Sequence, residues 1–216
     1  MIKKKETGLL VVISGPSGAG KGTICQKLIS RNKNVNLSIS MTTRNAREGE
    51  IDGVNYYFVS KEEFEKRIEE GKFLEYAIVH NEKYYGTPKD KVEEMLKQGK
   101  DVILEIDIQG ALKINNLVKE AVFIFIMPPN MKILKERLIK RNTETKEQII
   151  ERFTKAYTEI NEVSKYNYVV INDEVEEAVK KIEAILLSEK CRVDRIEDVD
   201  LNNKEEYTHE LITRDL

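Results

Sequence analysis

The chain has 216 residues, which is enough for one domain with a large hydrophobic core. Its 36 Lys and Arg residues nearly balance its 38 Asp and Glu residues, so no overall field selects nucleic acid or a membrane surface as a partner. The apolar run at residues 9–13 is too short for a signal peptide or a membrane span, and we expect a cytoplasmic protein.

Apolar runs alternate with helical patterns along the chain. Several short runs are β-branched or continuously apolar, as expected for strands buried on both faces, and they lie at residues 9–14, 101–107, 121–127 and 168–172. Apolar residues at helical spacing predict helices around residues 24–29, 92–96, 133–138 and 175–186. This order predicts an α/β fold with a mostly parallel sheet flanked by helices.

Two segments interrupt this alternation. Residues 37–87 carry Arg, Gly and Tyr in alternating patterns, with a short helix opened by the capping box of Ser60 and Glu63, and they predict an inserted, partly antiparallel lobe. Residues 137–153 carry basic residues on helical segments around a polar turn, which is typical of a mobile lid.

These segments divide one expected domain, residues 1–189, into a core and two insertions. The core consists of residues 8–36, 88–136 and 154–189. Residues 190–216 are rich in charge, with the spaced apolar residues Val193, Ile196 and Val199, and we expect a surface helix or a frayed tail. A contact between subunits of a homo-oligomer is one role that we consider for this segment.

The cysteines and histidines are isolated in the sequence. Cys25 and Cys191 lie far apart and outside any Cys-x-x-Cys motif, so neither a disulfide framework nor a zinc site is indicated. We expect both cysteines to be reduced and packed. His80 and His209 also lack partners at a metal-binding spacing.

A glycine loop, "GPSGAGKGT" at residues 15–23, lies between the first predicted strand and the first predicted helix. Gly15, Gly20 and Lys21 match the P-loop pattern in its required context. Backbone N–H groups of such a loop converge on the β-phosphate, and the lysine bridges the β- and γ-phosphates. A dinucleotide-binding G-x-G-x-x-G fails because Thr23 occupies the last position. The loop predicts a nucleoside triphosphate site on a P-loop NTPase-type core.

Gly22 stands where the P-loop pattern has a Ser or Thr hydroxyl that binds Mg²⁺. We expect phosphates and water to hold the ion, with Asp107 at the end of a predicted strand contacting it through water. Thr23 is expected to face the α-phosphate. A Lys-Gly-Thr ending also occurs in adenylate kinases, so the loop does not identify the phosphate acceptor.

Further motifs follow in the inserted lobe and the core: "SISMTTRNAREGEIDGVNYYF" at 38–58, "FLEYAIVHNEKYYGTP" at 73–88 and "LEIDIQG" at 104–110. With these motifs in this order, the chain resembles the guanylate kinases over about residues 8–188. The resemblance implies transfer of a phosphoryl group from ATP to GMP, and to dGMP, with Mg²⁺ as cofactor.

The residues of the lobe fit that acceptor chemically. Arg44 and Arg47 offer forked guanidinium donors, and Tyr56 and Tyr85 offer hydroxyls, for the dianionic phosphate of a nucleoside monophosphate. The resemblance assigns the base to further residues. Glu75 faces the guanine N1–H and N2–H donors with Glu105 reinforcing it, hydroxyls approach O6, and the GMP set is completed by Ser40, Thr87 and Asp107.

The resemblance also assigns the ATP side. Arg44 bridges toward the transferred group and lid arginines swing over the phosphates, which gives the catalytic set Lys21, Arg44, Arg137, Arg141 and Arg152. ATP is bound by Gly15, Pro16, Ser17, Gly18, Ala19, Gly20, Lys21, Gly22 and Thr23, with Asn172 contacting adenine. The chain departs from the family pattern at Gly22 for Ser, Glu105 for Asp and Asn142 for Gly.

Two alternatives remain open. One is a catalytically inactive guanylate-kinase-like module that binds peptides, although the intact Lys21, Arg44 and Arg47 argue against it. The other is a related kinase for another nucleotide or a phosphorylated sugar, and Glu75 and Thr87 favour guanine over both acceptors. We expect ATP and GMP as the partners, with no nucleic acid and no membrane.

Overall fold

The computed structural model describes residues 2–4, 7–79, 83–139 and 146–199. The strands are β1 (Ile2–Lys4), β2 (Leu10–Ser14), β3 (Val35–Leu37), β4 (Met41–Thr42), β5 (Tyr57–Phe58), β6 (Phe73–Val79), β7 (Lys83–Pro88), β8 (Asp101–Glu105), β9 (Val122–Met127), β10 (Tyr168–Ile171) and β11 (Ile196–Val199). The α-helices are α1 (Lys21–Arg31), α2 (Lys61–Glu69), α3 (Lys89–Lys97), α4 (Ile108–Leu117), α5 (Met131–Ile139), α6 (Lys146–Ile160) and α7 (Val175–Glu189). Short 3₁₀ helices follow at η1 (Asn161–Lys165) and η2 (Val193–Arg195).

The central sheet has five strands in the order β10-β9-β2-β8-β3, and every neighbouring pair is parallel. Its strands β2, β8, β9 and β10 lie within the apolar runs that predicted them. The predicted α/β fold with a mostly parallel sheet is therefore confirmed. Because parallel strands are connected by crossovers, their carboxyl ends lie at one edge, where α/β proteins bind ligands.

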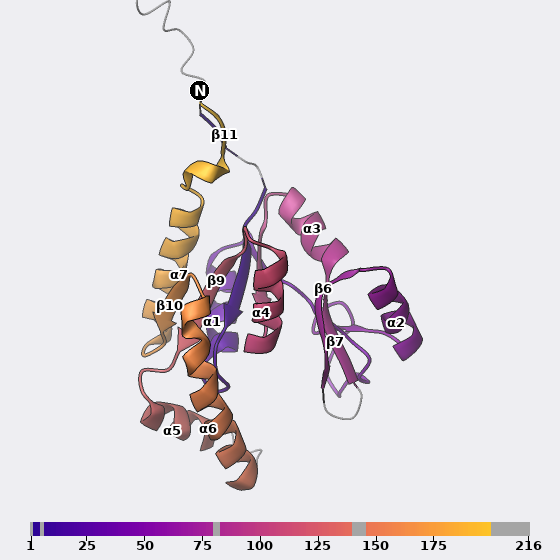
Figure 1. Ribbon diagram of the computed structural model, residues 1–216, viewed down its shortest axis with the longest axis vertical. Coiled ribbons are helices and arrows are strands. Elements are labelled where there is room, and N and C mark those ends of the chain that lie inside the picture. Colours follow the sequence, from indigo (N-terminus) through magenta and orange to yellow (C-terminus); the bar gives the residue numbers. More distant parts are fainter. Residues whose placement is uncertain (1, 5–6, 80–82, 140–145, 200–216) are drawn as a thin grey trace, which may run out of the picture.

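Helices cover both faces of this sheet, because its central strands β2, β8 and β9 carry apolar side chains on both sides. Val11 and Ile13 of β2 pack with residues of α1 and α7, whereas Val12 of the same strand packs with Val92 of α3 and Ile114 of α4. Figure 1 shows α1 and α7 on one side of the sheet and α3 and α4 on the other. Alternate side chains of the strands thus form two core layers, one on each face of the sheet. These layers hold in place the sheet edge that carries the glycine loop.

The inserted segment forms a second sheet of four strands in the order β5-β4-β7-β6. Strands β4 and β5 are parallel, whereas β7 runs antiparallel to both β4 and β6. Helix α2 covers this sheet through Phe64, which stacks on Phe73 at a centroid distance of 4.3 Å. The capping interaction was also predicted: the Glu63 backbone N–H donates to Ser60 Oγ at 3.2 Å. In Figure 1 this lobe projects away from the central sheet.

Helices α5 and α6 pack on each other below the glycine loop in the view of Figure 1. Their contact is a small apolar cluster of Leu134, Leu138 and Ala156. The expected lid, residues 137–153, thus begins within α5 and ends within α6. Residues 140–145, with Arg141 and Asn142, lie outside the described residues.

The segment after α7 differs from the expected surface helix. Residues 196–199 form β11, which pairs antiparallel with β1 near the amino terminus. The β-branched Ile196 and Val199 favour an extended chain, and pairing with β1 supplies the backbone hydrogen bonds that a lone segment would lack. Cys191 is exposed, so the expectation of a packed thiol is confirmed only for Cys25. In the described part of the chain, no helix is both long and apolar enough to span a membrane.

Candidate active site

The glycine loop has the geometry of a phosphate-binding loop. Gly15, Gly18 and Gly20 have φ angles of 144°, 86° and 92°, which side-chain-bearing residues rarely adopt. The loop ends at Lys21, the first residue of α1, so the amino end of the helix points into the loop. A helix amino terminus carries unpaired N–H groups and partial positive charge, which together bind phosphate.

Lys21 lies at the centre of this loop. Its Nζ donates hydrogen bonds to the carbonyl oxygens of Gly15 at 2.6 Å and Pro16 at 3.2 Å. Burial lowers the pKa of Lys21, and nearby carboxylates oppose that shift, first Glu105 and then Glu159. The ammonium is therefore held inside the loop, away from water. A bound triphosphate would bring negative charge next to it there.

Asn172, at the end of β10, supports the loop from behind. Its side chain is buried, and Nδ2 donates to the Ala19 carbonyl oxygen at 2.7 Å. A Cβ on Gly20 would lie only 2.3 Å from Nδ2, so the positive φ and the close approach both require glycine there. The Oδ1 atom of Asn172 is buried without a hydrogen-bond partner among the described residues. Asn172 thus connects the last strand of the sheet to the phosphate loop.

A cavity of about 250 Å³ lies beside the loop. It is lined by Gly18, Gly20, Thr23, Arg137, Asn172 and Val175. Arg137 of α5 donates from Nη2 to the Asn172 carbonyl oxygen at 3.0 Å, while its buried Nη1 has no partner in the described structure. A cavity next to a phosphate loop, with an unpaired guanidinium nitrogen at its wall, is suited to the donor nucleotide.

On the inserted lobe, Arg44 is surrounded by the residues expected to bind phosphate. It forms a two-pronged ion pair with Glu50, with both N–O distances at 2.8 Å, and its Nε donates to the Tyr85 hydroxyl at 3.2 Å. The guanidinium carbon lies 5.3 Å from the centre of the Tyr56 ring. The hydrogen bonds from Arg44 lower the pKa of Glu50 to about 2, so the pair is ionised at neutral pH. The cluster is a preformed cationic and phenolic surface.

Glu75 on β6 and Thr87 on β7 face each other across the antiparallel pair. Thr87 Oγ1 donates to Glu75 Oε1 at 2.7 Å. Burial raises the pKa of Glu75, and the negative charge of Asp107 adds to that shift. A Cβ on Gly110 would lie 3.3 Å from both Glu75 Oε2 and Asp107 Oδ1, so the two carboxylates approach the same point. A pair of carboxylates next to a hydroxyl forms an acceptor-rich surface for N–H donors.

Glu105 and Asp107 both act on the Lys21 ammonium, and Asp107 also acts on Glu75. Glu105 was expected to reinforce Glu75, but its Oε1 lies 3.4 Å from the position of a Cβ on Gly22; burial raises the pKa of Glu105, and the charge of Lys21 opposes that shift. Asp107 was expected to belong to the GMP set and to serve the metal through water; its side chain accepts from the Gly110 backbone N–H at 2.8 Å, and its charge acts on both Glu75 and Lys21. The reason is local: β8 ends at Glu105, and the backbone turns so that Asp107 caps α4.

The remaining predicted residues are less closely grouped. Ser40 is half-buried just before β4, and Arg47 is exposed, with its backbone N–H donating to Glu50 Oε2 at 2.7 Å. Arg152 lies on α6 and is half-buried. Arg141 is outside the described residues. Across those residues, no group of three or more His, Cys, Asp or Glu side chains is placed to hold a metal ion.

Sequence reasoning gave no role to two acidic residues. Glu50 holds Arg44 in place, and the signal for it was an acidic residue six positions after the arginine within the same motif. Glu159 of α6 is close enough to the Lys21 ammonium to raise its pKa, although it lies far from the loop in sequence. No sequence pattern marked Glu159, because it approaches the loop only through the packing of α6.

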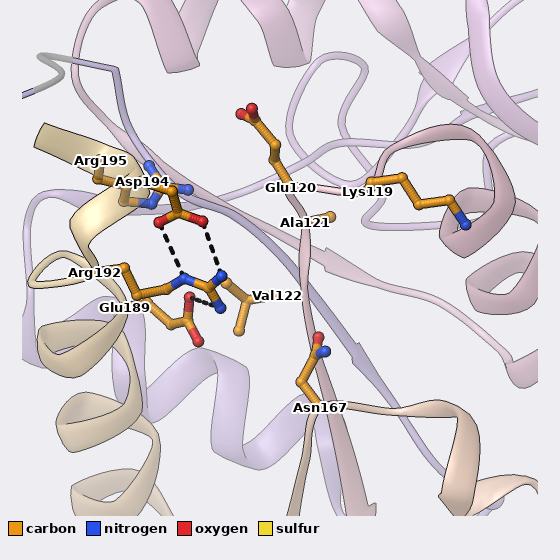
Figure 2. Close-up of a pocket in the computed structure, with 9 residues that line it drawn as sticks. All are labelled: Lys119, Glu120, Ala121, Val122, Asn167, Glu189, Arg192, Asp194 and Arg195. Atoms are coloured by element: carbon orange, nitrogen blue, oxygen red, sulfur yellow. Dashed lines mark hydrogen bonds and ion pairs between the residues drawn. The ribbon is translucent and has the colours of Figure 1, made fainter. Parts of the chain in front are cut away.

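A second cavity, of about 130 Å³, lies at the start of β9 and the end of α7. Figure 2 shows the Arg192 guanidinium between the carboxylates of Asp194 and Glu189. Arg192 is paired with carboxylates, as Arg44 is with Glu50, but none of the predicted site residues lines this cavity. The phosphate loop and the inserted lobe remain the candidate active site.

Comparisons with known proteins identify the family of the chain. A family model described as "Guanylate kinase" matches residues 7–189. The guanylate kinase of Clostridium perfringens is 61% identical over 209 residues, covering 97% of this chain and 96% of that protein. The Clostridium tetani enzyme is 62% identical over 205 residues, covering 95% and 98%.

A solved structure gives the same result at lower identity. The crystal structure of guanylate kinase from Anaplasma phagocytophilum superposes with a TM-score of 0.71 at 32% identity and covers 100% of both chains. The family model and these relatives match almost the whole described part of the chain. The chain belongs to the guanylate kinase family, whose members are ATP:GMP phosphotransferases.

Proposed function

We propose that this chain transfers the γ-phosphoryl group of ATP to GMP, giving ADP and GDP, with Mg²⁺ as cofactor and with dGMP as a second acceptor. The observation that carries the proposal is the Glu75–Thr87 pair, which together with Asp107 presents acceptors to N–H donors on the same lobe as the Arg44 cluster. Guanine presents N1–H and N2–H together, whereas adenine lacks that pair of donors. The family assignment supports the same reaction.

The donor ATP binds the loop of residues 15–23. Backbone N–H groups at the start of α1 bind the phosphates, and Lys21 contacts the β- and γ-phosphates. The cavity beside the loop accepts the nucleoside end of ATP. Asn172 acts there chiefly through the loop, because its amide is buried and holds the Ala19 carbonyl.

GMP binds the inserted lobe. Arg44 and Tyr85, already hydrogen-bonded to each other, contact the phosphate together with Tyr56 and Arg47. Glu50 orients Arg44 and leaves the arginine in one geometry, so little side-chain entropy is lost when the phosphate arrives. The guanine base is read by Glu75, Thr87 and Asp107, with the Ser40 hydroxyl near O6.

Catalysis of the transfer depends on positive charge and positioning. The transition state spreads charge over the equatorial oxygens of the transferred group. Lys21 stabilises that charge from the ATP side, and Arg44 does so from the GMP side. The lid supplies three further arginines, Arg137, Arg152 and Arg141. The unpaired Nη1 of Arg137 supports such a role, since it has a donor free for an anion. Closure of the lid and lobe excludes water, the competing acceptor.

Mg²⁺ fits the donor site. The ion typically binds one or two carboxylates together with substrate phosphates and water, and when bound it neutralises the charge of the phosphates. Glu105, which ends β8, and Asp107, the N-cap of α4, both act on the Lys21 ammonium and would be the carboxylates that hold the ion. A site completed by nucleotide phosphates needs no protein cluster of three ligands. We place the enzyme in the cytoplasm, where its nucleotide substrates occur, with neither nucleic acid nor a membrane as a partner.

The proposal is tested with ATP labelled in its γ-phosphate. On incubation with GMP and Mg²⁺, the label should appear in GDP and not in inorganic phosphate. Release of the label as inorganic phosphate at the same rate with and without GMP would show an ATPase and would refute the assignment. No transfer at all under these conditions would instead favour an inactive binding module.

A further inference from the structure

A glutamate of α6 lies on the side of that helix that meets the phosphate loop. The apolar cluster between α5 and α6 also contacts the loop, because a Cβ on Gly18 would lie 2.9 Å from Leu134 Cδ1 and 3.1 Å from Leu138 Cδ2. Ala156 of α6 is fully buried in this cluster. Glu159 follows three residues later, and residues three apart share one face of a helix. Glu159 therefore lies on the face toward the loop, and its side chain is only 16% exposed.

The carboxylate of Glu159 interacts with groups of the loop that would bind phosphate. Burial raises the pKa of this carboxyl, and the positive charges of Lys155 and Lys21 oppose that shift, as does the backbone N–H of Ser17. The ion pair with Lys155, at 3.8 Å, is open to solvent, because Lys155 is 62% exposed, and such contacts contribute little. The lysine and the backbone N–H groups of a P-loop are the donors that a triphosphate uses. Carboxylate and phosphate thus compete for the same groups.

Three carboxylates act on the Lys21 ammonium, and they differ in the elements that carry them. Glu105 ends β8 and Asp107 caps α4, so the central sheet and its helix fix both of them. Glu159 is instead carried by the helix that continues from the expected lid, since α6 is unbroken over Lys146–Ile160. A movement of the first half of α6 is therefore transmitted to the Glu159 carboxylate.

Helix α6 has two features that allow such a movement. Thr154 and Thr158 donate their hydroxyls to backbone carbonyl oxygens four residues earlier, at 3.0 and 3.2 Å, and this type of bond often bends helices. Directly after Ile160 the chain changes to the 3₁₀ helix η1, and such a change often marks a hinge. Glu159 thus lies between a segment that bends easily and a change of helix type.

From this arrangement we propose that Glu159 is a positioning residue of the donor site: its carboxylate holds α6 against the phosphate loop, and the γ-phosphate of ATP displaces it. The phosphate brings more negative charge to Lys21 and the loop N–H groups than one carboxylate does. ATP binding therefore releases α6, which carries Arg152, to move with the lid. We call the contact of Glu159 with the loop the Glu159 latch. This inference rests on the proposed function only in that ATP is the donor.

Affinity for a non-hydrolysable ATP analogue tests the latch without turnover. A latch that is closed about 90% of the time lowers the apparent affinity about tenfold. Glu159→Gln removes the charge and nearly keeps the shape of the side chain. It should therefore bind the analogue about tenfold more tightly than the wild type, as measured by isothermal titration calorimetry with Mg²⁺ and without GMP.

The position of α6 is the second readout, because loss of a negative charge alone would tighten binding without moving the helix. Spin labels are attached to Lys27→Cys on α1 and Ile150→Cys on α6, which are both exposed positions. Cys191 is exposed and is replaced by serine, whereas Cys25 is buried. Electron–electron double resonance should show distances in the wild type that change when the analogue binds. In Glu159→Gln, the distances without the analogue should already be shifted toward those of the complex.

Glu151→Gln is the matched control, because Glu151 is exposed on the same helix and the change in charge is equal. It should leave both the affinity and the distances as in the wild type. The proposal is overturned if Glu159→Gln binds the analogue no more tightly than the wild type, or if its distances without the analogue equal those of the wild type. It is also overturned if Glu151→Gln has the same effects. Should Glu159→Gln fail to fold, Glu159→Ala gives the same comparison.

Failure of this proposal and failure of the proposed function give different results. The titration and the distances are measured without GMP, so wild-type behaviour in Glu159→Gln leaves phosphoryl transfer to GMP untouched. Conversely, a wild-type enzyme that does not phosphorylate GMP would leave both measurements interpretable, because they report the ATP side alone.

Discussion

Glu75→Gln is the substitution that probes base recognition most narrowly. Thr87 Oγ1 donates to Glu75 Oε1 at 2.7 Å, and a glutamine can keep that contact by turning its amide oxygen toward Thr87. The amide nitrogen then takes the position of Oε2, where it presents N–H donors to the N–H donors of guanine. One charge-assisted hydrogen bond is lost, and it is replaced by a repulsive contact.

The expected loss follows from this exchange. A hydrogen bond to a charged group contributes about 1.5–3 kcal/mol, which corresponds to a decrease of about 10- to 150-fold in kcat/KM for GMP. Steady-state ADP release measured with GMP as the varied substrate checks this value. Glu69→Gln, at an exposed glutamate near the end of α2, is the matched control and should change little. An unchanged kcat/KM for GMP in Glu75→Gln would refute the hypothesis that this carboxylate recognises guanine.

The pH dependence of GMP use tests the same group. The Glu75 carboxylate must be ionised to accept two N–H donors, and burial raises its pKa in the free enzyme. The value of kcat/KM for GMP should therefore fall as the pH decreases through that raised pKa, at a higher pH than for an ordinary glutamate with a pKa near about 4.3. Glu75→Gln should lack this acidic limb, and an identical profile in both proteins would contradict the assignment.

Three substitutions test the loop and the core. Lys21→Ala should abolish phosphoryl transfer while leaving the circular dichroism spectrum unchanged, since within the described structure its ammonium donates hydrogen bonds only to loop carbonyls. Gly20→Ala should lower the free energy of unfolding in urea by about 1–3 kcal/mol, because its Cβ would lie 2.3 Å from Asn172 Nδ2 at a φ of 92°. Asp101→Ala should lower it by about 1–3 kcal/mol, since it leaves the buried Leu9 N–H, now bonded to Asp101 Oδ1 at 2.9 Å, without an acceptor.

Each of these has a control at a comparable but less constrained position. Lys27 is exposed on the same helix as Lys21, and Lys27→Ala should keep activity. Gly49 has a φ of 83° with nothing near its Cβ position, so Gly49→Ala separates backbone strain from the clash with Asn172. Asp194 is an exposed partner of Arg192, and Asp194→Ala should change stability by less than about 0.5 kcal/mol. Equal effects in a variant and its control would contradict the structural reason given.

Much of the fold could be predicted because its signals are local. The strands β2, β8, β9 and β10 lie in predominantly apolar runs, and helices cover both faces of β2, β8 and β9. The short strands β3 and β11 were not predicted. Residues 35–37 and 196–199 contain polar side chains, and their strand conformation depends on pairing with β8 and β1 respectively. Such pairing is a tertiary interaction without a local pattern.

The candidate site shows the same division. Lys21 and the loop glycines follow from a motif with a fixed geometry, and the grouping of Arg44 with Tyr56 and Tyr85 was also expected. The separate positions of Glu105 and Asp107 could not be predicted from their spacing. Residues two apart share a face only while a strand continues, and β8 ends between them. The residue at which β8 ends therefore sets where each carboxylate lies.

The central claim is that this chain phosphorylates GMP because its inserted lobe reads guanine. The most direct measurement is ADP release with ATP and each of GMP, dGMP, AMP, CMP and UMP at equal concentration. We predict rapid release with GMP, measurable release with dGMP, and kcat/KM for AMP lower by a factor of about 10⁴, because the buried acceptors of the lobe would be left unpaired. Equal rates with AMP and GMP would contradict the account.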